Sequence, residues 1–157
     1  MSRIEDLASA ILAGAQRVIA GYDELSPFLG EALPVADDDL RNLPIIQRIA
    51  SIALLKRFEQ LQDQLARLAR AVIELDLEKP VRMTVRDIAN KMEERRIVAD
   101  ADDWVDLNAL RNQLVHEYPI GNREQVERVN ECWAAMPKLV AIHDRLRAYL
   151  VNQGVEA

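Results

Sequence analysis

The feature that most constrains the fold of this chain is a helical pattern from Pro44 to Leu77. Proline suits the first position of a helix, because it gives up no intrahelical hydrogen bond there, and Lys79-Pro80 closes the pattern at its other end. An unbroken helix of this length would extend for roughly 50 Å, longer than a domain of this size normally spans. We therefore expect a helix that is bent or divided, or one that forms a seam with a second copy of the chain. The residues expected on its inward side are Ile45, Ile49, Ile52, Leu55, Leu61, Leu65, Leu68, Val72 and Leu75.

A second helical pattern lies at the N-terminus, over residues 2–21. Ser2 and Glu5 have the spacing of a capping box, and we expect Gly21 to end the helix. Residues 22–43 are rich in proline, glycine and aspartate, so we interpret them mostly as a connection with room for a short turn of helix. The residues predicted to form the buried face of the first helix are Ile4, Leu7, Ala8, Ile11, Leu12, Ala15, Val18 and Ile19.

Two more helices are predicted in the middle of the chain. Thr84, with Asp87 three residues later, is typical of a helix start, and this helix is expected to run to about Arg96. The next is expected from about Asp103 to Tyr118, with Leu107, Leu110 and Leu114 facing inward. Aspartates gather near its start, at positions 100, 102, 103 and 106. A metal site would need these oxygens to converge, so we interpret the run as an N-cap and an acidic first turn, which the helix dipole favours.

We expect Asn122 to cap the last predicted helix, with Gln125 at the third helical position, and the helix to continue towards Val151 with a kink at Pro137. Two of its residues, Trp133 and Met136, are expected in the core. His143, which has charged neighbours, is expected to be a surface histidine or one with satisfied hydrogen bonds, in preference to a ligand.

These patterns predict an all-α protein. The 157 residues suit a single domain, spanning 1–157, and half of them are hydrophobic, which is typical of a globular chain. No segment has the alternation of a strand. We therefore expect an up-and-down bundle of about five helices. The single Cys132 excludes an internal disulfide framework and a cysteine cluster for zinc.

Charge and hydropathy narrow the function classes. A net charge of −6 argues against a protein that grips nucleic acid nonspecifically, because phosphate neutralisation supplies most of that affinity. It leaves room for a small local site and suits a protein that binds a partner. No window is apolar for long enough to cross a membrane, and the N-terminus is too polar for a signal peptide. A reducing cytoplasm fits the chain best.

The most informative motif is residues 111–118, Arg-Asn-Gln-Leu-Val-His-Glu-Tyr. Arginine can neutralise phosphate oxygens bidentately, and histidine exchanges protons near neutral pH. Asn112 and His116 lie four residues apart, so they project from nearly one helix face, and Arg111 and Tyr118 nearly align on a neighbouring face. Pro119 disfavours helical geometry at Tyr118, which predicts a site at the C-terminal end of a helix.

This motif resembles the Arg-x4-His-x-Tyr motif of HEPN proteins, specifically the HepT toxins that are paired with minimal nucleotidyltransferase antitoxins. The resemblance covers the helical layout loosely and residues 107–118 closely. It implies a HEPN-like bundle that dimerises, and a metal-independent endoribonuclease without a cofactor, whose site forms between two copies of the motif. Arg111 and His116 match the catalytic pair of the family, and Asn112 matches its polar companion. Tyr118 matches the tyrosine to which the partner nucleotidyltransferase attaches AMP, which neutralises the toxin.

Two other interpretations stay open. Some helical relatives are noncatalytic substrate-binding or scaffold subunits of a nucleotidyltransferase, in which Arg111 and His116 would bind a nucleotide phosphate or hold the partner. The chain could also be a plain helical dimerisation module.

Overall fold

The structure is a computed structural model that describes residues 2–76, 78–116 and 121–156, and within these ranges it is helical and contains no strand. The elements are α1 (Arg3–Leu29), the short 3-10 turn η1 (Leu40–Asn42), α2 (Ile45–Leu75), the 3-10 turn η2 (Pro80–Arg82), α3 (Val85–Glu94), α4 (Ala101–His116) and α5 (Asn122–Asn152). The prediction of an all-α chain with about five helices is confirmed.

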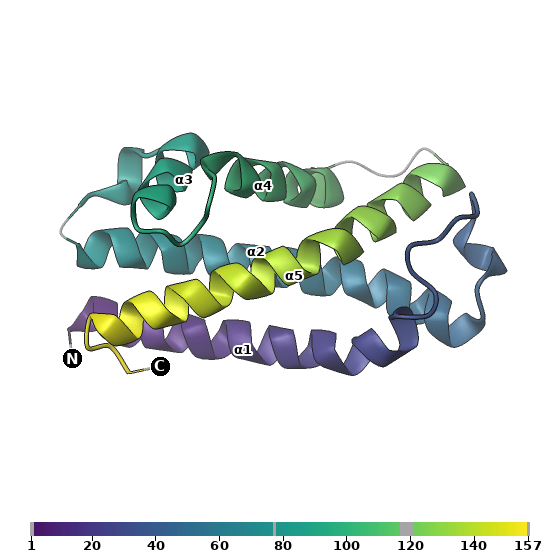
Figure 1. Ribbon diagram of the computed structural model, residues 1–157, viewed down its shortest axis with the longest axis horizontal. Coiled ribbons are helices and arrows are strands. Elements are labelled where there is room, and N and C mark those ends of the chain that lie inside the picture. Colours follow the sequence, from purple (N-terminus) through teal and green to yellow (C-terminus); the bar gives the residue numbers. More distant parts are fainter. Residues whose placement is uncertain (1, 77, 117–120, 157) are drawn as a thin grey trace.

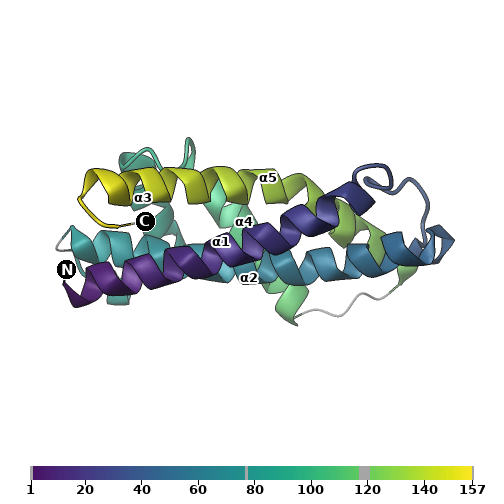
Figure 2. The same cartoon turned by 90° about the horizontal axis from the view of Figure 1, so that it is seen from below.

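The four long helices run alternately up and down in one bundle, and the short α3 lies beside the last turns of α2 (Figure 1). The central element is α2, which packs against each of the other α-helices. The most extensive contacts of α2 are with α1, and the two helices lie side by side over most of their length (Figure 2). None of the helices in the described ranges has the length and apolar character that a membrane crossing requires.

The first helix is longer than its sequence signals predict. It begins with the expected capping box between Ser2 and Glu5 but passes through Gly21 and includes Pro27. A Cβ added to Gly21 would stand 2.7 Å from Cζ of Arg57, so this glycine makes room for a side chain of α2 and does not end the helix. Buried Leu29 continues the inward face to the end of α1. The segment 22–43 is therefore helical in its first third, where the prediction of a connection is wrong. Residues 30–43 form the predicted connection, with η1 as a short turn of helix.

The second helix is not divided. Its 31 residues form one element, roughly 46 Å long. The inward residues of its second half are buried as predicted: Leu61, Leu65, Leu68 and Val72. The prediction is wrong for its first turns, where the exposed fractions are 61% for Ile45, 62% for Ile49 and 44% for Ile52. Leu7 of α1, also predicted to be buried, is 45% exposed.

The last helix corrects the expected cap and separates the two alternatives for His143. Its N-cap is Gly121, with no side-chain cap, while the amide of Asn122 donates instead to Oδ2 of Asp39 at 3.0 Å. His143 is not at the surface: it is 5% exposed, because it lies on the same side of α5 as the buried Leu139 and Leu146, and its Nδ1 lies 3.0 Å from Oδ1 of Asp144. The expected core position of Met136 is confirmed; Trp133 is partly buried against the core, with its ring 6.2 Å from that of Tyr22.

Candidate functional site

Residues 111–116 of the predicted motif lie on the last two turns of α4, and residues 117 and 118 lie outside the described ranges. This helix begins as the sequence suggested: Oδ1 of Asp100 accepts a hydrogen bond from the backbone N–H of Asp102 at 2.8 Å, and Glu93 accepts from the N–H of Ala101 at 2.6 Å. Carboxylates at these positions satisfy amide groups that a helix start leaves unpaired. Among the residues that the structure describes, no group of three potential ligands could hold a metal ion.

The apolar side of α4 holds the motif against the bundle. Leu107 is buried, and Leu110 and Leu114 pack partly buried against the core, as predicted. The polar residues lie off this side: Asn112 and His116 are exposed, and Arg111 is partly buried. Side chains that chemistry could use are therefore presented at the surface of a rigid element.

The best-defined contact of the motif joins Arg111 to Asp63 of α2. The guanidinium donates from Nε to Oδ1 at 2.8 Å and from Nη2 to Oδ2 at 3.2 Å, which is a bidentate pair. The side chains are 25% and 46% exposed, respectively, and a pair open to solvent to this degree adds little to stability. Its main effect is geometric, because the two bonds fix the plane and direction of the guanidinium.

Only part of the motif converges within one protomer. Nη1 of Arg111 donates to Oδ1 of Asn112 at 3.3 Å, so these two residues and Asp63 form one polar group. His116 is the last residue of α4, and its side chain has no hydrogen-bond or ion-pair partner among the residues that the structure describes. Tyr118, the predicted site of AMP attachment, lies outside the described residues.

Sequence reasoning missed Asp63. The sequence shows only an acidic residue between two glutamines in the middle of a long helix, and nothing local indicates that its partner lies 48 positions away. The neighbouring Gln62 was also unexpected, because its side chain is 1% exposed and neither of its amide atoms has a hydrogen-bond partner. The middle of α2 therefore carries polar groups on its buried side as well as beside the motif.

A second polar cluster lies at the C-terminal end of α2. Oδ2 of Asp76 accepts hydrogen bonds from Nε of Arg95 and from the hydroxyl of Tyr149, each at 2.6 Å. Glu78 pairs with Arg95 and with Nζ of Lys91, the latter at 2.8 Å. The hydrogen bond from Lys91, with that from Arg95, lowers the pKa of Glu78. These contacts tie the end of α2 to α3 and α5, so we interpret the cluster as structural.

Comparisons of the chain with protein-family models, with curated proteins and with solved structures find no match. The function therefore has to be inferred from the motif and from its surroundings in the bundle.

Proposed function

We propose that this chain is a HEPN-type, metal-independent endoribonuclease that acts as the toxin of a toxin–antitoxin pair. The observation that supports the proposal is the position of three motif residues: Arg111, Asn112 and His116 lie off the apolar side of one helix end, and Asp63 fixes the direction of the arginine. The resemblance of residues 107–118 to the HepT motif supplies the reaction class.

The proposed reaction needs only groups that these residues and RNA provide. The 2′-oxygen of a ribose attacks the adjacent phosphorus, the bond from phosphorus to the 5′-oxygen breaks, and a 2′,3′-cyclic phosphate remains. One histidine takes the proton of the 2′-hydroxyl, and a second, protonated histidine gives a proton to the leaving 5′-oxygen. Arg111 stabilises the charge that develops on the phosphate oxygens. One protomer has a single histidine in the motif, so the complete site requires His116 from two copies, related by a twofold axis.

Control of the activity is proposed to act at Tyr118. A phenol oxygen can attack the α-phosphate of ATP, which releases pyrophosphate and leaves AMP on the tyrosine. The added phosphate would compete with RNA for Arg111, and the adenosine would block access. This step rests on the sequence motif alone and calls for a cognate nucleotidyltransferase as the partner.

The test is to express the chain alone and with its neighbouring gene, and to follow growth and RNA integrity. Wild-type chain should slow growth and degrade RNA, while His116→Ala and Arg111→Ala should do neither, and Gln113→Ala on the exposed side of the same helix should behave as wild type. Both motif residues lie off the buried side of α4, so their loss leaves no large core cavity. Growth arrest by well-expressed His116→Ala would rule out the ribonuclease proposal.

A second candidate is the noncatalytic subunit of a nucleotidyltransferase. The observation that favours it is the Arg111–Asp63 pair, since a guanidinium already paired with a carboxylate offers less positive charge to the phosphate of a reacting RNA. In that case the wild-type chain would be harmless when expressed alone, but it would copurify with the nucleotidyltransferase.

A further inference from the structure

A hollow of about 530 Å³ lies where η1, the first turns of α2 and the first turns of α5 meet. Its volume is in the range of small-molecule sites, which are mostly apolar with a few polar groups. Four aliphatic side chains form the apolar part of the lining: Leu40, Ile49, Ile52 and Ala53. Three polar side chains complete it: Arg41, Arg48 and Gln125. Among the residues that the structure describes, no aromatic ring and no carboxylate lines this hollow.

The arginines give the hollow an excess of positive charge. Arg41 is already paired, because its Nη2 lies 2.7 Å from Oδ2 of Asp39, which also accepts a hydrogen bond from Asn122 at 3.0 Å. The hydrogen bonds from Arg41 lower the pKa of Asp39, and the charge of Arg48 adds to this effect. The guanidinium of Arg48 itself has no hydrogen-bond or ion-pair partner among the described residues. Two arginines and one aspartate therefore leave one positive charge unbalanced, on a chain whose net charge is −6.

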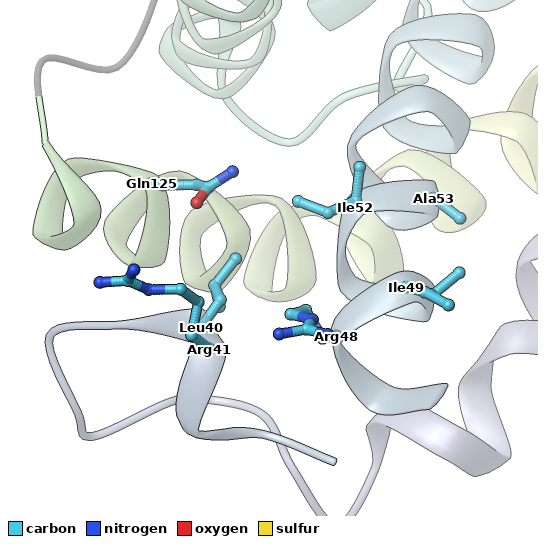
Figure 3. Close-up of a pocket in the computed structure, with 7 residues that line it drawn as sticks. All are labelled: Leu40, Arg41, Arg48, Ile49, Ile52, Ala53 and Gln125. Atoms are coloured by element: carbon cyan, nitrogen blue, oxygen red, sulfur yellow. The ribbon is translucent and has the colours of Figure 1, made fainter. Parts of the chain in front are cut away.

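The position of Arg48 directs this charge into the hollow. Figure 3 shows its side chain reaching from α2 towards η1, with Ile52 on the same wall and Gln125 of α5 across the hollow. A guanidinium binds a carboxylate through two parallel hydrogen bonds, and a glutamine amide can donate a further one. The walls offer no ring on which a nucleotide base could stack. The lining therefore suits a ligand with one negative charge and an aliphatic chain.

We propose that this hollow binds a medium-chain fatty acid, with its carboxylate on Arg48 and its chain against the aliphatic wall. Each methylene that leaves water should raise the affinity about fourfold, so affinity should depend on chain length as well as on charge. The site is separate from the α4 motif, because Ala53 precedes Asp63, the partner of Arg111, by ten residues, or roughly 15 Å of helix. The proposal does not rest on the ribonuclease function.

The test is isothermal titration calorimetry of the full chain with sodium decanoate. Wild type should bind one equivalent with a dissociation constant on the order of 100 µM or lower. Octanoate, which is two methylenes shorter, should bind about 15-fold more weakly. Decylammonium has the same chain length and the opposite charge, and it should bind more weakly than decanoate by about tenfold or more, although the net charge of the protein favours a cation.

Two variants test the assignment of the residues. Arg48→Gln should weaken decanoate binding by about tenfold or more, because it removes the charge that holds the carboxylate. Ala53→Phe should weaken binding as well, because its ring fills the hollow from the α2 wall. The matched control is Arg67→Gln, an exposed arginine further along α2 that does not line the hollow, and its affinity should match that of wild type. Melting temperatures equal to that of wild type would show that the variants are folded; if one does not fold, the other carries the test.

No binding of decanoate to folded wild type at about 1 mM would overturn the proposal. Equal affinity for decanoate and decylammonium, or unchanged affinity in folded Arg48→Gln, would do the same. Acetate that binds as tightly as decanoate would overturn the assignment of a fatty acid, since the aliphatic chain would then contribute nothing. These measurements do not involve RNA, so the fatty-acid site and the ribonuclease proposal can fail separately.

Discussion

The substitution Gln62→Met is predicted to stabilise the protein. The side chain of Gln62 is 1% exposed, and both its Nε2 and its Oε1 lack a hydrogen-bond partner. A buried polar group left unpaired costs about 1–3 kcal/mol, and methionine has nearly the same shape and length without that cost. The free energy of unfolding should therefore rise by about 1–3 kcal/mol, which corresponds to an increase in melting temperature of roughly 2–12 °C for a chain of this size.

The assay is urea unfolding followed by circular dichroism, at one fixed protein concentration because association stabilises the folded state. The urea concentration at the midpoint should rise, while the slope of the free energy of unfolding against urea concentration stays unchanged. The matched control is Gln64→Met, two residues along α2, where the side chain is partly exposed; its effect should stay within about 0.5 kcal/mol. A Gln62→Met protein that is less stable than wild type would refute the reasoning, since the amide would then contribute more than it costs.

Three further predictions concern other parts of the bundle. Burial raises the pKa of Cys132 to about 12, so a thiol reagent at pH 8 should leave the native protein unmodified and label it only after denaturation; rapid labelling of native protein would contradict the burial. The pKa of Glu78 is lowered from 4.5, so the stability that it contributes is present above about pH 4.5 and is lost as the pH falls through the lowered pKa; Glu78→Gln should therefore destabilise the protein at pH 6 and do so progressively less as the pH is lowered below 4.5 in chemical unfolding, and an effect that does not shrink would argue against it. In α1, a Cβ on Gly14 would meet its nearest atoms at an ordinary 3.7 Å, so Gly14→Ala should raise the free energy of unfolding by about 0.5–1 kcal/mol, whereas a lower melting temperature would reveal a clash.

Local signals in the sequence predicted the helix starts that depend on neighbouring residues only. The capping boxes at Ser2 and Thr84 formed as expected, because their donors and acceptors lie within four residues. The end of α1 was predicted wrongly for the opposite reason: Gly21 is a typical terminator, but its role is set by Arg57, which only tertiary packing brings close. Nonlocal packing outweighed the local preference.

The candidate site also contains residues that local sequence predicts and residues that only tertiary packing brings close. The sequence predicted that Arg111, Asn112 and His116 would share a helix end, since helical periodicity determines it. The partner Asp63 belongs to another helix, and its pairing depends on how α2 and α4 pack. Periodicity also could not separate the exposed Ile45, Ile49 and Ile52 from the buried residues of α2, because both follow one spacing; which of them are covered depends on how the other helices pack against α2.

The most direct test of the proposed function is cleavage of a defined RNA by the purified chain in excess EDTA, with the product ends identified by mass spectrometry. Wild type and Gln113→Ala should cut the RNA and leave 2′,3′-cyclic phosphate, and His116→Ala should be at least about 100-fold slower, the lower range for loss of an acid–base group. No cleavage by folded wild-type protein, or equal rates for wild type and His116→Ala, would contradict the assignment of the α4 motif as a ribonuclease site.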